Sequence, residues 1–323
     1  MQETIVNILG LQRSGTSMLS TMLAHGAEAI AVGEIGGWYR LAQYRTGTTP
    51  PLKYAFASEV PRHEFHRAAM EHLEADMIID SSKSLEWALE VNRWHRDTDV
   101  RVFNILIWKH PVAHTYSLWK RGLRDSLSPR FYKWPYYHRR LLRSGVEFVS
   151  IRCDMLIDQP ENTLGALCRL IGLPYFAGKE YFWEAEESLL GSSPGVKQQA
   201  DRGTSKLQLE SHPPAFHPIA GRVRQEINSS DALRRVLQEL AARDIVTHPE
   251  LVASSGHAYT PSLHFQIEHY LTRLAKDSFL RFRFNFLQSL FGHDVGRLYL
   301  RYFTPDIKRT SGSFDPGENR EAP

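Results

Sequence analysis

The stretch that decides the fold is Ile5-Val-Asn-Ile-Leu-Gly-Leu-Gln-Arg-Ser-Gly-Thr-Ser-Met-Leu-Ser-Thr-Met-Leu23. A run of β-branched and other apolar residues leads up to Gly10, which is typical of a buried strand, and after Gly15 the apolar residues recur at helical spacing. The pattern predicts a strand, a tight loop and a helix that starts at Thr16 or Ser17. The first N–H groups of such a helix are unpaired and its dipole is positive there, so we expect an anion at this loop.

The loop keeps the two glycines of the G-x-x-x-x-G pattern but lacks the lysine that follows it in nucleoside-triphosphate P-loops. That lysine binds the terminal phosphates, and the hydroxyl after it binds Mg²⁺. Here Thr16 follows Gly15, and Arg13 is the one cation of the loop. The residues therefore indicate a phosphate-like ligand that is held without the usual metal arrangement. The same glycines also fit an ordinary strand-to-helix turn in another kind of α/β protein.

The composition is that of a soluble globular protein, with 42% hydrophobic and 23% charged residues among 323. The net charge of +3 favours anionic ligands but is too small to indicate nucleic acid. Cys153 and Cys168 are typical of core thiols in a reducing compartment. The N-terminus carries no signal-peptide pattern, and no apolar run is long enough for a membrane helix, so we expect a cytoplasmic protein.

Strand patterns alternate with helical patterns along most of the chain. Further strands are expected at 29–32, 77–80, 100–108 and 147–152, and helices at 64–74, 129–143, 159–172 and 228–243, with others beginning near Leu85 and Pro111. A polar stretch at 191–218 is of the kind that often forms a lid or binding segment. The alternation predicts right-handed βαβ units and a P-loop-like three-layer α/β fold, in which helices cover both faces of a central parallel sheet.

Ligands of open parallel sheets bind at the carboxyl ends of the strands. At that edge the sequence places two clusters that can bind anions, one carboxylate and one further cation. The groups concerned are the loop Arg13–Ser17, then Glu34, then Ser81–Lys83, and then Lys109 with Ser117.

Several segments of the chain resemble motifs of the PAPS-dependent sulfotransferases. Arg13-Ser-Gly-Thr-Ser17 is similar to the 5′-phosphosulfate loop of that family, and Ile105–Ser117 to its 3′-phosphate motif. Val32-Gly-Glu-Ile35 resembles the G-E element and Asp80-Ser-Ser-Lys83 the D-S-S-K element. A strand and helix at 151–174 close on the family's Gly-Leu-Pro. The resemblance spans about residues 1–240, and the combined order is more specific than any single segment.

The 3′-phosphate motif departs from the family pattern. Lys109 stands where the family has its first arginine, His110 replaces an aspartate, and Val112 replaces the second arginine. A lysine neutralises a phosphate but cannot form the bidentate fork of an arginine. The segment 217–222 is similar to a basic element that closes over the nucleotide in bacterial members, so Arg222 or Arg224 is expected to supply the missing fork.

The resemblance implies metal-independent, in-line transfer of a sulfuryl group from PAPS to an acceptor hydroxyl, preferably on a carbohydrate or glycolipid, the reaction of class EC 2.8.2. It implies that Glu34 is the general base and that Lys83, with Arg13, stabilises charge on the transferred group. It also implies that the 5′-phosphosulfate is held by the loop and the 3′-phosphate by basic and hydroxyl groups. The donor-binding residues are then Arg13, Ser14, Gly15, Thr16, Ser17, Lys109, Ser117 and Arg222.

Other interpretations of these residues stay open. Glu34 also fits a carboxylate that favours a helix N-terminus, and Lys83 also fits a structural pair with Asp80 or Glu86. Lys109, Ser117 and Arg222 also fit solvated or helix-facing positions. His66, His110 and His114 are alternative bases. At the level of function, the alternatives are a small-molecule kinase that uses the loop on ATP and a non-catalytic module that binds anions or glycans.

Composition divides the chain into the sulfotransferase-like domain at 1–250, a helical extension at 251–309 and a disordered tail at 310–323. Within the extension, residues 262–303 interleave arginines with aromatic side chains. This pattern fits packing on the core, a homodimer contact, or peripheral contact with an anionic membrane surface. The extension is not needed for the family resemblance.

Overall fold

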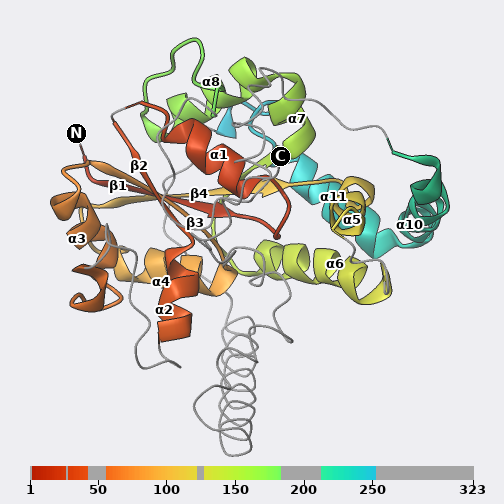
Figure 1. Ribbon diagram of the computed structural model, residues 1–323, viewed down its shortest axis with the longest axis horizontal. Coiled ribbons are helices and arrows are strands. Elements are labelled where there is room, and N and C mark those ends of the chain that lie inside the picture. Colours follow the sequence, from red (N-terminus) through yellow and green to blue (C-terminus); the bar gives the residue numbers. More distant parts are fainter. Residues whose placement is uncertain (1, 27, 43–55, 122–126, 183–211, 252–323) are drawn as a thin grey trace, which may run out of the picture.

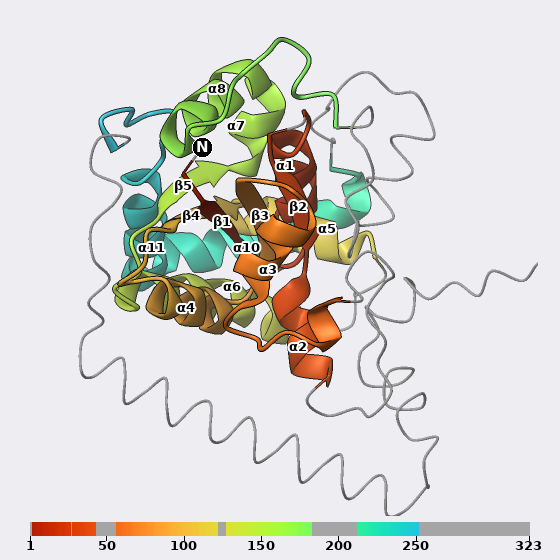
Figure 2. The ribbon, with the colours of Figure 1, turned by 90° about the vertical axis from the view of Figure 1, so that its left-hand side faces the viewer.

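The computed structural model describes residues 2–26, 28–42, 56–121, 127–182 and 212–251. The expected C-terminal extension beyond residue 251 and the tail lie outside the described residues, and so does most of the expected loop at 191–218. Figures 1 and 2 show the described part as an α/β unit around one central sheet. Within it, no helix is both long enough and apolar enough to cross a membrane.

The centre of the fold is a parallel sheet of five strands in the order β2-β3-β1-β4-β5. Every residue of β1 is buried, as expected for the middle strand of a covered sheet. The strands are β1 Thr4–Leu9, β2 Ile30–Gly33, β3 Met77–Lys83, β4 Arg101–Trp108 and β5 Val149–Arg152.

Helices cover both faces of this sheet (Figure 2). One face packs against α1 Thr16–Leu23, α7 Cys153–Asp158 and α8 Pro160–Ile171. The opposite face packs against α2 Ile35–Ala42, α3 Phe65–His72, α4 Leu85–Trp94 and α6 Leu127–Arg143. The predicted three-layer α/β fold is therefore confirmed.

Three further helices pack together beside the sheet (Figure 1). They are α5 Pro111–Trp119, α10 His217–Ser229 and α11 Asp231–Ala241. The helix expected at 228–243 is α11, which begins at Asp231 because Ser230 adopts an extended backbone and its hydroxyl caps the helix by accepting from the N–H of Leu233. Pro218 lies in the first turn of α10, where a missing N–H does no harm, so the Pro- and Gly-containing sequence is still helical.

The edge beyond β5 is closed by the segment that follows α11. Ser150 donates its N–H to the carbonyl of Arg243 at 2.7 Å, and its own carbonyl accepts from the N–H of Ile245 at 3.0 Å. The hydroxyl of Ser150 donates to the carbonyl of Leu240 at 2.7 Å. These bonds occupy backbone groups that an exposed edge strand would present to another chain.

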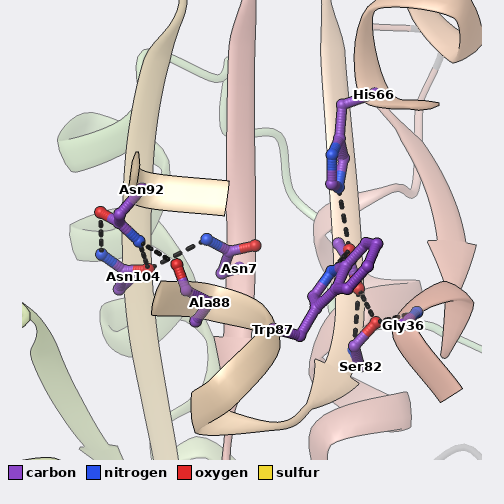
Figure 3. A network of polar contacts seen from close by, with 9 residues as sticks. Asn7, Gly36, His66, Ser82, Trp87, Ala88, Asn92 and Asn104 are labelled. Atoms are coloured by element: carbon purple, nitrogen blue, oxygen red, sulfur yellow. Dashed lines mark hydrogen bonds and ion pairs between the residues drawn. The ribbon is translucent and has the colours of Figure 1, made fainter. Parts of the chain in front are cut away.

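A buried amide network fixes the middle of the sheet (Figure 3). The side-chain amide of Asn7 in β1 donates to Oδ1 of Asn104 in β4 at 3.0 Å, and Asn92 of α4 donates to the same oxygen at 3.0 Å. Asn104 in turn donates to the carbonyl of Glu147 at 3.0 Å. Because buried amides are costly unless paired, this network favours the observed register, in which Asn7 lies opposite Asn104.

The connections between strands change face at β1. The crossover from β1 to β2 runs through α1 on one face, whereas the next three crossovers use helices of the opposite face. Such a reversal separates the loops at the carboxyl ends of neighbouring strands, and ligands of open α/β sheets bind there. The carboxyl end of β1 is thus the place where a site is expected.

Candidate functional site

The loop between β1 and α1 requires both of its glycines. Gly10 has φ +151°, and a Cβ there would lie 2.5 Å from the carbonyl oxygen of Ile107. Gly15 has φ +104°, and its Cβ would lie 3.0 Å from Sγ of Cys153. The helix α1 begins at Thr16, one of the two predicted starts. The backbone of this loop therefore approaches β4 and α7 more closely than any residue with a side chain allows.

The charges of Arg13 and Lys109 both act on His114. The Nε2 atom of His114, in α5, lies 3.0 Å from the carbonyl oxygen of Gln12 and so joins α5 to the loop. Burial lowers the pKa of His114 to about 4, and the positive charges of Lys109 and Arg13 lower it as well. The two basic groups that the sequence assigned to opposite ends of a nucleotide thus act on one common residue.

Lys109 follows β4 and reaches forward along α5. Its ammonium group donates to Oγ of Ser117 at 3.2 Å. Its backbone carbonyl accepts from the indole N–H of Trp134 at 2.9 Å, which fixes the residue from α6. The structure therefore brings together the two residues predicted to bind a 3′-phosphate.

An arginine of α10 also acts on this region. Burial lowers the pKa of His110, and so do the positive charges of Arg152 and Arg224. The helix α10 packs against α5 through a shared apolar cluster that includes Val112. Of the two arginines considered for the missing fork, it is Arg224 rather than Arg222 whose charge acts on the residue next to Lys109.

Glu34 and Lys83 form an ion pair at the carboxyl ends of β2 and β3. The ammonium group of Lys83 donates to Oε1 of Glu34. The Lys83 side chain is 15% exposed and that of Glu34 is 39% exposed, so the carboxylate is the more open member of the pair. Glu34 also lies at the start of α2, where its carbonyl accepts from the N–H of Gly37 at 3.0 Å. Glu34 thus lies both at the N-terminus of α2 and beside Lys83. This position fits a carboxylate that favours a helix terminus as well as a carboxylate of the site.

Register shifts in β3 aim Lys83 toward Glu34. Asn7 lies opposite Asp80, but Leu9 lies opposite Lys83, so β3 contains one more residue than β1 over this span. A second shift separates β2 from β3 at the same level. Lys83 itself has φ +62°, a left-handed conformation that costs energy for a residue with a side chain. Bulges of this kind commonly turn side chains at sites, and the predicted end of β3 at Asp80 is too early by three residues for this reason.

Asp80 anchors the backbone just before Lys83, and its partners His66, Ser82 and Trp87 are labelled in Figure 3. Its carboxylate accepts from Nε2 of His66 at 2.9 Å, from the indole N–H of Trp87 at 2.6 Å and from the N–H of Ser82 at 2.8 Å. The hydroxyl of Ser82 donates to the same carboxylate and accepts from the N–H of Gly36 at 2.8 Å. Asp80 is therefore a structural acceptor that links α3, α4 and the first turn of α2.

The carboxylates of Asp80 and Glu86, which were considered as structural partners of Lys83, bond to other residues. Asp80 is bonded as described above, and Glu86 accepts from the guanidinium of Arg140 at 2.8 Å. In the part of the chain that the structure describes, Lys83 pairs with Glu34. Two of the histidines considered as alternative bases have structural contacts. His66 is fully buried against Asp80, and His110 is the N-cap of α5, where it accepts from the N–H of Val112.

One residue of this region was not assigned a role from the sequence. Tyr137 of α6 accepts from the N–H of Gly10 at 2.9 Å and donates to the carbonyl of Lys83 at 3.0 Å. Its position in the sequence, far from both partners, carries no signal of this contact. Among the described residues, no group of three or more His, Cys, Asp or Glu side chains is placed to hold a metal ion.

Comparisons with known proteins give matches among solved structures. No protein-family model matches the chain, and no curated protein gives a significant sequence match. The sulfotransferase domain of the olefin synthase of Synechococcus PCC 7002 is 16% identical, covering 71% of this chain and 96% of its own, with a TM-score of 0.44. The sulfotransferase domain of the curacin biosynthetic pathway is 16% identical, covering 68% and 97%, with a TM-score of 0.43.

A third similar structure is the sulfotransferase from Alicyclobacillus acidocaldarius, which is 15% identical. The match covers 72% of this chain and 99% of that protein, with a TM-score of 0.32. Because a fold does not determine a function, similarity at this level does not identify a donor, an acceptor or a mechanism.

Proposed function

We propose that the protein is a PAPS-dependent sulfotransferase that transfers the sulfuryl group to a hydroxyl-bearing acceptor. One observation carries the proposal. A carboxylate and an ammonium group, Glu34 and Lys83, meet at the carboxyl ends of the adjacent strands β2 and β3, and β3 is the neighbour of β1, which leads into the loop Gly10–Gly15. A base and a cation beside an anion-binding loop are what transfer between a charged donor and a hydroxyl acceptor requires.

The residues present fit a donor with two separate anionic groups. Neither Gly10 nor Gly15 has room for a Cβ, so the tight turn from β1 into α1 needs both glycines. The unpaired N–H groups at the start of α1 would face the phosphosulfate. Arg13 and the start of α1 at Thr16–Ser17 would hold that end. Lys109 and Ser117, with Arg224 nearby, would hold the 3′-phosphate.

The proposed reaction is an in-line displacement at sulfur. The acceptor oxygen attacks the sulfur, the bond between the sulfur and the bridging oxygen breaks, and 3′-phosphoadenosine 5′-phosphate leaves with the electron pair. Glu34 takes the proton of the acceptor hydroxyl, and Lys83 stabilises the charge that develops on the bridging oxygen. The ion pair keeps the carboxylate and the ammonium group in contact before the substrates arrive, so little reorganisation is needed.

Calorimetry and a transfer assay test this proposal in two steps. The protein should bind 3′-phosphoadenosine 5′-phosphate, and it should then transfer label from PAPS to members of a panel of carbohydrates, glycolipids and phenols. Hydrolysis or transfer of the γ-phosphate of ATP with Mg²⁺ would instead favour the kinase interpretation. Nucleotide binding without transfer to any acceptor would favour a non-catalytic binding module. No heat with the nucleotide at millimolar concentration would overturn the proposal.

A further inference from the structure

A single phenolic hydroxyl lies between the two halves of the candidate site. The hydroxyl of Tyr137 accepts from the N–H of Gly10, the first residue of the anion-binding loop, at 2.9 Å. It donates to the carbonyl oxygen of Lys83 at 3.0 Å. Burial raises the pKa of Tyr137, so the hydroxyl keeps the proton that the second bond requires. Both of these backbone groups are bonded by one side chain of α6.

Both partners of Tyr137 lie at irregular points of the backbone. Gly10 is where the chain leaves β1, at φ +151°, and Lys83 follows the register shift in β3, at φ +62°. A backbone in a left-handed conformation persists only where its surroundings fix it. For Lys83 the residue before it is fixed from the α2 side, through Ser82 and Asp80, and its own carbonyl is fixed from the α6 side by Tyr137.

We propose that Tyr137 is a positioning residue, which sets Lys83 relative to the donor loop and keeps its ammonium group directed at the reacting atoms. This inference rests on the proposed function. Rotation of the Lys83 peptide would carry the side chain away from Glu34, since the ion pair depends on the direction in which Cβ leaves this strained backbone. Tyr137 contacts neither donor nor acceptor in this scheme and acts only through Gly10 and Lys83.

Replacement of Tyr137 by phenylalanine removes the hydroxyl and keeps the ring. We expect kcat to fall by roughly 10- to 100-fold, since misplacement of a catalytic group by about 1 Å costs on the order of 100-fold. The dissociation constant for 3′-phosphoadenosine 5′-phosphate should change by less than about threefold, because Arg13, Lys109 and Ser117 are untouched. The neighbouring Tyr136, which is 51% exposed, provides the matched control, and Tyr136→Phe should leave both values unchanged.

A double-mutant cycle separates positioning from a general loss of structure. In a Lys83→Met background there is no ammonium group to position, so Tyr137→Phe should cause little further loss of kcat. Tyr137→Met, which also lacks the hydroxyl but packs flexibly, replaces the phenylalanine variant in the cycle if that variant does not fold. Thermal unfolding of each variant shows whether it is folded at the assay temperature.

The outcomes distinguish this inference from the proposed function. If the wild-type protein neither binds the nucleotide nor transfers sulfuryl groups, the proposed function fails. If the wild-type protein is active and Tyr137→Phe keeps its kcat, the positioning role is wrong. The role is equally wrong if the loss caused by Tyr137→Phe is the same in the wild-type and Lys83→Met backgrounds.

Discussion

Lys83 donates to the carboxylate of Glu34 although 49 positions separate the two residues in the sequence. Each lies at the carboxyl end of its strand, and β2 and β3 are neighbours in the sheet. The contact is a consequence of topology, because a parallel sheet gathers the ends of distant strands at one edge. It places a carboxylate and an ammonium group together at the edge of the sheet where the loop that begins at Gly10 also lies.

Replacement of Glu34 by glutamine should abolish transfer and spare donor binding. The amide keeps the shape of the side chain but cannot take a proton, so we expect kcat to fall by roughly 100- to 10,000-fold, the range of general-base catalysis. The dissociation constant for 3′-phosphoadenosine 5′-phosphate should stay within about threefold by calorimetry. Glu71→Gln, at an exposed position of α3, is the control. Unaltered turnover of the Glu34 variant would exclude this residue as the base.

The two arginines of α10, Arg222 and Arg224, should differ in their effect on nucleotide binding. Arg224 acts electrostatically on His110, next to Lys109, so Arg224→Ala should weaken binding of 3′-phosphoadenosine 5′-phosphate by about tenfold, as for one charged hydrogen bond. Arg222→Ala serves as the matched control, since it removes the same charge two residues away. Equal effects of the two substitutions would mean that α10 contributes only a general positive potential. Titrations at two salt concentrations measure that contribution.

Loss of the Lys109 ammonium group should reduce donor affinity more than any change at its hydroxyl partner. Lys109→Met is expected to raise the dissociation constant of the nucleotide by roughly 10- to 100-fold, because a charged hydrogen bond is lost, and Ser117→Ala by less than about tenfold. Lys109→Arg keeps the charge and adds a second donor group. Isothermal titration of the three variants checks the order, and an unchanged affinity in Lys109→Met would remove this residue from the donor site.

Two adjacent glycines of α2 should respond in opposite ways to alanine. A Cβ on Gly36 would lie 2.6 Å from the ring of Trp87, which donates to Asp80, so Gly36→Ala should destabilise the protein by about 1–3 kcal/mol through overpacking. Among the described residues no atom lies within 4 Å of a Cβ built on Gly37. Gly37→Ala should therefore stabilise the helix by up to about 1 kcal/mol. Urea unfolding of the two variants measures both values, and a similar loss in each would contradict the role of the Trp87 contact.

The sequence predicts much of this arrangement because the relevant signals are local. Gly10 and Gly15 stand where the backbone has no room for a side chain, and apolar periodicity sets the strands β1 and β4. The parallel sheet then follows from the alternation of strands and helices, and it brings the predicted residues Glu34 and Lys83 to one edge.

What the sequence does not reveal depends on long-range contacts. The bulge that carries β3 on to Lys83 is fixed by Asp80 with its partners from α3 and α4, and none of these contacts leaves a periodic pattern. The hydroxyl of Tyr137 bridges two segments far from it in the chain. The charge of Arg224 becomes distinguishable from that of Arg222 only when α10 is packed against α5.

Buried histidines should make the protein acid-sensitive between about pH 6.5 and pH 4. His114 has its pKa lowered to about 4, mainly by burial, and the pKa of the fully buried His138 is lowered to about 3 for the same reason. The unfolded chain takes up protons on these rings below about pH 6.5, whereas the folded protein does not until lower pH. The unfolded state therefore binds more protons in this window, and the free energy of unfolding must fall as the pH falls.

The effect at His114 should be measurable by substitution. One pKa unit corresponds to about 1.4 kcal/mol, so the shift at His114 lowers the free energy of unfolding by up to about 3 kcal/mol by pH 4. Above pH 6.5 the ring is neutral in both states, and none of this stability is lost. Thermal unfolding between pH 4 and pH 7 should show a midpoint that declines toward acid, with a shallower decline in His114→Gln. The exposed His63→Gln variant should follow the wild-type curve. Parallel curves for wild type and His114→Gln would mean that His114 takes up its proton equally in the folded and unfolded states, and would contradict the lowered pKa.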